Sequence, residues 1–178
     1  MAAEPQGTFL EHLSPSEQGR VLAALLDTHP QLRPSADQLA YAELCDVSPD
    51  AVAAEMVDIY LDQPFFEISN RVGRQPGRGY VDETEAQWEL LEETLAPFVA
   101  EIARLARAGL HEVATRQALG IIAGLEMLRG SAGEETLIGW GELNQHVSEL
   151  IEAVGYACRK AGVDVEVEQV LAHQPATG

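Results

Sequence analysis

Apolar side chains recur at helical spacing along most of this chain. Between Asp82 and Gly109 they alternate at three and four residues, which is typical of one buried helix face. The positions are Trp88, Leu91, Leu95, Phe98, Ile102 and Leu105. Two further stripes run through Leu110, Ala114, Ala118, Ile121, Leu125 and Leu128 and through Trp140, Leu143, Val147, Leu150, Val154 and Cys158. Each stripe predicts a helix that packs against neighbouring helices.

The short link between the first two stripes, residues 107–111, predicts an antiparallel helical hairpin. We therefore expect an all-α protein: a single-domain helical bundle or short helical-repeat stack of about six to seven helices around a central long hairpin. The expected organisation is an N-terminal arm over 1–13, one helical domain over 14–171 and a tail over 172–178. A basic loop over 71–82 separates a three-helix N-terminal part from the long helices.

Several short motifs predict where helices begin and end. Capping residues or a first-turn proline mark helix starts at Ser14-Pro15-Ser16-Glu17, Ser35-Ala36-Asp37-Gln38, Ser48-Pro49 and Asp82. Glycines that follow a helical pattern, and so predict helix ends, are Gly109, Gly130 and Gly162. Pro64 bounds the third helix.

Three residues inside the predicted helices need an explanation. Gly120 and Gly124 lie one turn apart, and each costs about 1 kcal/mol relative to alanine in a helix interior. We expect close approach of a neighbouring helix backbone to compensate for this cost. Pro97 leaves the carbonyl of Glu93 without its helical donor, so we expect a kink or break near Leu95.

Strand patterns are almost absent. The one alternating segment is Val163–Glu168, near the C-terminus. It is compatible with a strand, a short terminal helix or an irregular tail.

Charge is strongly negative and unevenly distributed. The chain has 178 residues, with 11 Lys+Arg against 29 Asp+Glu and a formal net charge of -18. This balance argues against nucleic acid bound through its phosphates as a partner. Residues 71–79 carry three arginines and no acid, whereas residues 80–103 carry seven acids and no base. A basic loop therefore directly precedes an acidic helix.

The sequence favours a cytoplasmic protein with no membrane partner. Residues 1–7 contain neither a basic residue nor an apolar run, so no secretory signal is expected there. No apolar stretch approaches the roughly 20 residues that a bilayer span needs. Cys45 and Cys158 match no metal-binding or redox spacing, and we expect them to behave as small buried hydrophobes.

One row of carboxylates could hold a divalent cation. Glu85, Glu89, Glu92 and Glu93 share one helix face, but a Mg²⁺ or Mn²⁺ site also needs a facing acidic pair. The candidates for that pair are Glu134, Glu135 and Glu142, and a solvated helix face is the favoured interpretation. The histidines are scattered, and nucleotide and nucleophile motifs are missing. We accordingly predict no catalytic, metal-binding or cofactor-binding residues.

The basic loop is the favoured place for a partner. The run from Gly73 to Gly79 is expected to be a flexible surface connection, in which Pro76 removes one N–H donor. Aromatic residues cluster around it, at Phe65, Phe66, Tyr80 and Trp88. Arginine beside exposed aromatic side chains is typical of binding hot spots. The predicted partner-binding residues are Arg71, Arg74, Arg78 and Tyr80.

Two segments carry a family resemblance. Leu105–Ala114, with a small-residue turn and an alanine early in its second helix, resembles the helix-turn-helix of a tetratricopeptide-type repeat. Residues 22–128 are similar to the helical regions that accompany SWIM-type zinc fingers in bacterial proteins, through the Leu22–Leu39 helices around His29-Pro30, the Gly79-Tyr80-Val81-Asp82 segment and the long hairpin. The zinc finger's own ligands are missing here, so the resemblance implies a helical, repeat-like scaffold and no catalytic residues.

Three functions remain open from the sequence. The first is a protein–protein interaction module or scaffold without catalytic activity. The second is an acidic inhibitor, either a nucleic-acid mimic or a toxin-neutralising partner, whose negative charge would speed its encounter with a basic target. The third is a carboxylate–metal hydrolase. The sequence favours the first and leaves the partner and the oligomeric state open.

Overall fold

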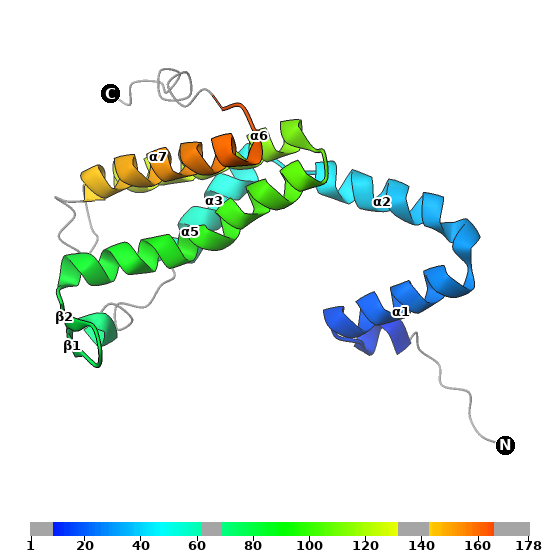
Figure 1. Ribbon diagram of the computed structural model, residues 1–178, viewed down its shortest axis with the longest axis horizontal. Helices are drawn as coiled ribbons and strands as arrows, with labels where there is room; N and C mark the ends of the chain where they lie inside the picture. Colours follow the sequence, from blue (N-terminus) through cyan, green and yellow to red (C-terminus); the bar gives the residue numbers. More distant parts are fainter. Residues whose placement is uncertain (1–8, 62–68, 132–142, 166–178) are drawn as a thin grey trace. The chain divides into compact units, whose positions relative to one another are not determined.

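The computed structural model describes residues 9–61, 69–131 and 143–165 (Figure 1). Helices dominate these residues, which confirms the predicted all-α class. The chain divides into two compact units, Met1–Glu43 and Leu44–Gly178.

From residue 9 onward, where the structure describes it, the first unit contains two helices and two short 3-10 turns. They are η1 (Phe9–His12), α1 (Pro15–Thr28), η2 (Pro30–Leu32) and α2 (Arg33–Cys45), whose last two residues belong to the second unit. The capping box predicted at Ser14 is confirmed: the Ser14 N–H donates to Glu17 Oε2 at 2.9 Å, and the Glu17 N–H donates to Ser14 Oγ at 3.4 Å. Neither α1 nor α2 contains a buried residue.

The start predicted for the second helix, with Ser35 as the cap and Ala36 as the first helical residue, is wrong by three residues. α2 begins at Arg33, because η2 runs directly into it and leaves no extended residue for a cap. Pro34 then lies in the first helical turn. An N–H group there has no intrahelical acceptor, so the missing N–H of proline costs no hydrogen bond. Ser35 is consequently inside the helix.

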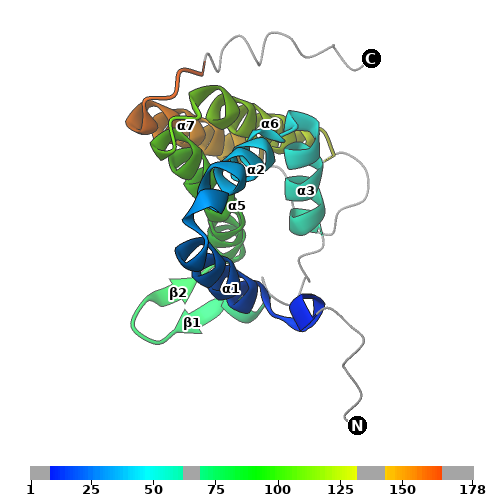
Figure 2. The same ribbon diagram turned by 90° about the vertical axis from the view of Figure 1, so that its right-hand side faces the viewer.

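In its described residues, the second unit contains long helices and a small hairpin. The elements are α3 (Pro49–Leu61), β1 (Gly73–Gln75), β2 (Gly79–Val81), α5 (Glu83–Arg107), α6 (His111–Ser131) and α7 (Leu143–Ala161). The predicted starts at Ser48 and Asp82 are confirmed by side-chain bonds to the Ala51 and Glu85 N–H groups. α6 contacts each of the other three helices, and Figure 2 shows α3 and α7 on opposite sides of it.

One hydrophobic core joins these four helices. The described side chains of the predicted stripes face it, with Trp88 and Leu110 partly buried at its margin. The largest fully buried side chains are Ile102, Leu105, Ile121, Ile122, Leu125, Leu128, Val147, Val154 and Cys158. Each large aliphatic side chain removed from water stabilises the fold by about 1.5–3 kcal/mol. Arg116 supports the margin, donating from Nη2 to the Cys45 carbonyl at 3.0 Å.

The two glycines of α6 allow α3 to pack closely, as predicted. A Cβ at Gly120 would lie 2.6 Å from Val52 Cβ and 2.7 Å from the Pro49 carbonyl oxygen. A Cβ at Gly124 would lie 2.6 Å from Met56 Cε and 3.1 Å from the Ala53 carbonyl oxygen. The contacts advance in the same direction along both helices, from Gly120 and Pro49 to Gly124 and Ala53, so α3 and α6 run parallel. The close contact compensates for the low helix propensity of glycine.

Gly109 and Gly162 end their helices as predicted, both through the Schellman pattern. At the end of α5, the Leu110 N–H donates to the Leu105 carbonyl at 3.0 Å, and Gly109 has a φ of 79°. At the end of α7, the Val163 N–H donates to the Cys158 carbonyl at 2.9 Å. In both cases glycine adopts the left-handed conformation that the cap requires. The first cap turns the chain into the predicted α5–α6 hairpin.

α5 continues through Pro97, so the predicted break does not occur, while the alternative, a kink, stays a prediction. Pro97 is exposed, whereas Leu95 and Phe98 on either side are buried, so core packing holds the helix on both sides of the proline. α6 ends at Ser131, one residue beyond the helix end predicted at Gly130. Residues 163–165 of the alternating segment form no regular element, and its remainder lies outside the described residues.

Candidate functional site

The basic loop is a two-stranded antiparallel hairpin. β1 and β2 pair in the register Gly73 with Val81, Arg74 with Tyr80, and Gln75 with Gly79. The Arg78 N–H donates to the Gln75 carbonyl at 3.3 Å, and Gly77 has a φ of 83°. Proline followed by a glycine with positive φ gives this turn the features of type II.

The prediction of a flexible connection over residues 73–79 is therefore wrong. Pro76 alone indicates a missing donor to an anion, but it is followed directly by Gly77. That pair is the signal that could have revealed the turn, because proline sets φ at its first central position and glycine accepts the positive φ at the second. The strands have only three residues each, too few for an alternating pattern to be visible.

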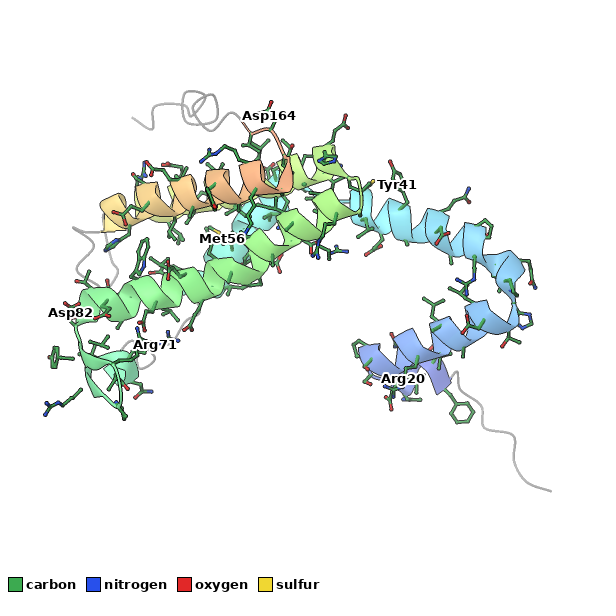
Figure 3. The ribbon with its side chains drawn as sticks, viewed as in Figure 1. Arg20, Tyr41, Met56, Arg71, Asp82 and Asp164 are labelled. Atoms are coloured by element: carbon green, nitrogen blue, oxygen red, sulfur yellow. The ribbon has the colours of Figure 1, made fainter. Side chains whose placement is uncertain are left out.

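Two arginines attach the hairpin to the acidic face of α5. Arg71 Nη2 lies 2.7 Å from Glu93 Oε2. Arg78 pairs with Glu89, and its Nη2 lies 4.0 Å from Glu85 Oε1. In Figure 3, Arg71 lies beside the first turns of α5, close to Asp82 at the start of that helix. The basic loop and the acidic helix thus neutralise each other in part.

These pairs shift the ionisation of their members. The hydrogen bond from Arg71 is the main reason why the pKa of Glu93 lies below its usual value. The hydrogen bond to Glu89, reinforced by its charge, raises the pKa of Arg78. Because one member of each pair, Glu93 or Arg78, is exposed to solvent, each pair stabilises the hairpin only modestly.

A small apolar cluster joins the hairpin to the first turns of α5. Val81, Ala86 and Leu90 are buried together, and Val72 packs against them. The Gln75 side-chain amide donates to the carbonyls of Asn70, at 3.3 Å, and Arg71, at 3.0 Å. The hairpin is therefore held by apolar contacts, hydrogen bonds and ion pairs together.

The other face of the hairpin points outward. Arg74 and Tyr80 are cross-strand partners, so their side chains emerge side by side on the same face of the ribbon. Both are exposed, and Tyr80 is 72% accessible. Within the part of the chain that the structure describes, Arg74 forms no ion pair. The four predicted binding residues therefore separate into two anchoring arginines, Arg71 and Arg78, and one outward pair, Arg74 and Tyr80.

The carboxylate row on α5 is largely engaged with the hairpin. Glu85, Glu89 and Glu93 face arginines, while Glu92 is exposed. Among the described residues, no group of three or more histidine, cysteine, aspartate or glutamate side chains could hold a metal ion. Glu134, Glu135 and Glu142 lie outside those residues.

A second polar cluster lies where α6 ends and α7 begins. The Trp88 and His146 rings are 4.8 Å apart between centroids. Arg129 Nη2 donates to Ser148 Oγ at 2.9 Å, and its Nη1 lies 3.0 Å from Glu126 Oε1. Both ring nitrogens of His146 are buried and have no hydrogen-bond partner among the described residues. No local sequence pattern predicts this cluster, because its members come from three separate helices.

Neither cysteine has the surroundings of a nucleophile. Cys158 is buried in the core, and this burial raises the pKa of its thiol, which disfavours the thiolate. Cys45 is half-buried at the core margin, and both thiols are free.

Other predicted features lie partly outside the described residues, among them Phe65, Phe66, Trp140 and the bounding Pro64. In the residues that are described, none of the helices combines the length and the apolar character that crossing a bilayer requires.

Comparison with protein-family models, with curated proteins and with solved structures finds no match to this chain.

Proposed function

We propose that this protein is a protein–protein interaction module without catalytic activity, and that it binds a partner through Arg74 and Tyr80. The observation that carries the proposal is that the four residues of this segment have two different roles. Arg71 and Arg78 hold it against α5, while the cross-strand pair Arg74 and Tyr80 faces solvent.

The chemistry of this pair supports a binding role. Tyrosine offers a large contact area at a low cost in conformational entropy, and arginine adds charge and planar hydrogen bonding. An anchored hairpin also loses little additional freedom when a partner binds, which favours affinity. A tyrosine needed only for folding would bury its ring, as Tyr60 does at 7% accessibility.

The other two candidate functions receive less support. A nucleic-acid mimic needs free carboxylates along one face, whereas three of the four in the α5 row face arginines. The same pairing gives these carboxylates a structural role, which weakens the argument for a metal-dependent hydrolase.

Site-specific photocrosslinking tests the proposal. p-Benzoylphenylalanine is placed at position 80 in the producing cells, and at position 156 as a matched control, since Tyr156 on α7 is 63% accessible. We expect an adduct from position 80 only. The captured protein is then purified, and its affinity for variants is measured by calorimetry.

We expect Tyr80→Ala to weaken binding by about tenfold or more, as hot-spot truncations do, and Tyr156→Ala to change it less than about twofold. Arg74→Glu should also weaken binding. Equal adducts from both positions, or an unchanged affinity for Tyr80→Ala, would reject the hairpin as the binding site.

A further inference from the structure

The hairpin packs on α5 through an apolar cluster of its own. Figure 1 shows β1 and β2 beside the first turn of that helix. Val81, Ala86 and Leu90 are the buried members of the cluster, and Val72 packs against them. This cluster is separate from the core that joins α3, α5, α6 and α7, to which the neighbouring Leu91 belongs. Opening of the hairpin would therefore remove no side chain from that core.

Few apolar contacts hold this small element in place. β1 and β2 have three residues each, and a two-stranded hairpin alone is marginally stable at best in water. Among the described residues, the hairpin contributes Val81 to the cluster as a buried side chain and Val72 as a partly buried one. Segments with few buried apolar contacts open locally at a lower free energy than the whole fold. The ion pairs with α5 are therefore an appreciable part of what keeps the hairpin closed.

The carboxylates that face the hairpin arginines lie on α5. Glu93 Oε2 is 2.7 Å from Arg71 Nη2, and Glu85 Oε1 is 4.0 Å from Arg78 Nη2, which also pairs with Glu89. The other charged or titratable side chains nearby form no ion pair within the residues that the structure describes. They are Arg74 and Tyr80 on the hairpin, Asp82, Glu83 and Glu92 before and along α5, and His146 of α7, whose ring contacts Trp88.

Acid removes the negative charge from each of these contacts. The hydrogen bond from Arg71 lowers the pKa of Glu93 in the folded protein. This pairing therefore stabilises the closed hairpin above the pKa of an unfolded glutamate, and the stabilisation is lost as the pH falls through the folded value. Both arginines stay charged in acid, so once the three carboxylates are neutral they face no counter-charge on α5.

We propose that the hairpin is an acid-sensitive switch. At neutral pH, Arg71 and Arg78 hold residues 71–81 against α5, and neutralisation of Glu89 and Glu93 lets this segment open while the helical core stays folded. Opening changes the segment from a neutralised hairpin to a basic loop, because its arginines no longer face carboxylates. This inference concerns the conformation of the hairpin and does not depend on the function proposed for its outward pair.

Amide hydrogen exchange of the full chain at pH 6 and pH 3.5 tests the proposal. Rates are corrected for the intrinsic effect of pH, and amides of residues 73–81 are compared with core amides such as those of Ile121 and Val154. We expect protection of the hairpin to fall about tenfold between the two pH values, as two lost ion pairs allow, and protection of the core to fall less than threefold. A fall of less than threefold in the hairpin, or a parallel fall in both regions, would overturn the proposal.

Neutral variants of the carboxylates should reproduce the effect of acid at pH 7. Glu89→Gln with Glu93→Gln should lower hairpin protection about tenfold at pH 7 and remove most of the further fall at pH 3.5. The matched control is Glu92→Gln with Glu152→Gln, which removes the same charge from two exposed residues and should change hairpin protection less than twofold. Equal losses in both double variants would indicate an effect of net charge alone and reject the switch.

Circular dichroism separates opening of the hairpin from unfolding. Helix content should be the same at pH 6 and pH 3.5, and the same in both double variants at pH 7. Loss of helix together with hairpin protection would mean that acid unfolds the second unit as a whole, and this result would also overturn the proposal.

Discussion

The two units of this protein use the same kind of amphipathic helix in opposite ways. In the second unit, the stripes of α5, α6 and α7 meet α3 in one core, where Ile102, Ile121 and Val154 are completely buried. In the first unit, α1 and α2 also carry apolar side chains, but none of their side chains is buried. The capping motifs predict helices in the first unit and the apolar stripes predict them in the second, but burial follows only in the second.

The largest difference in the free energy of unfolding should come from replacing one leucine by alanine in each unit. Leu125→Ala removes a core side chain that is 1% accessible, and it should lower the free energy of unfolding by about 2–5 kcal/mol. Leu25→Ala changes a side chain that is 44% accessible and should cost less than about 0.5 kcal/mol. Urea denaturation followed by circular dichroism measures both, since Trp88 and Trp140 belong to the second unit and their fluorescence would not report on the first. Equal losses would show that the first unit is packed as tightly as the second.

Alkaline pH should destabilise the second unit through Tyr60. Desolvation raises the pKa of this phenol to about 12, whereas an unfolded tyrosine ionises near 10. The proton is held more tightly in the folded state, so the stabilisation is complete below pH 10 and is lost as the pH rises to 12. The loss should reach about 3 kcal/mol.

Denaturation at several pH values and absorbance at 295 nm measure this loss. Tyr60→Phe should remove the part of the alkaline decrease that lies between pH 10 and 12. If the variant and the parent protein lose stability in parallel over this range, Tyr60 is not the group responsible.

Replacing a helical glycine by alanine should destabilise the second unit and stabilise a helix of the first. Gly120→Ala places a methyl group 2.6 Å from Val52 Cβ and should destabilise the second unit by about 1–3 kcal/mol. Gly19→Ala in α1 meets no atom within 4 Å and should increase local helix stability by about 1 kcal/mol. Thermal unfolding measures the first and amide exchange in α1 the second. A stabilised Gly120→Ala protein would contradict the close packing of α3 on α6.

The smallest effect should come from the hairpin. Because the pKa of Glu93 is lowered in the folded state, its pairing with Arg71 stabilises the protein above the pKa of an unfolded glutamate and is lost as the pH falls through the folded value. At neutral pH, Arg71→Gln should cost at most about 1 kcal/mol, since Glu93 is largely exposed. A double-mutant cycle with Glu93→Gln measures the coupling energy. A coupling that survives 1 M salt undiminished would show that the contact is not mainly electrostatic.

The long helices could be predicted from the sequence because their signals are local. The Trp88–Leu105 stripe, the Ser14 capping box and the glycines at 109 and 162 each act within a few residues of the chain. The Gly120–Gly124 pair also predicted a close helix neighbour, although nothing in the sequence identified that neighbour as α3.

The geometry of the candidate site could not be predicted from the sequence. Arg71, Arg74, Arg78 and Tyr80 lie in one basic segment of the chain, but their division into anchors and an outward pair depends on contacts with α5. Arg71 reaches Glu93 across 22 positions of sequence, and local patterns do not encode such pairings. The His146–Trp88 contact likewise joins helices that only the tertiary fold brings together.

The glycine contact between α3 and α6 has a consequence for the order of folding. The α5–α6 hairpin closes through a short turn, whereas α3 must find α6 across an intervening segment that includes the whole of α5. Short loops close at a lower entropic cost than long ones, so the helical hairpin should form early and α3 should dock on it late. Gly120→Ala should then accelerate unfolding and leave the refolding rate nearly unchanged. The docking of α3 would then be a late step that stabilises an α5–α6 hairpin that has already formed.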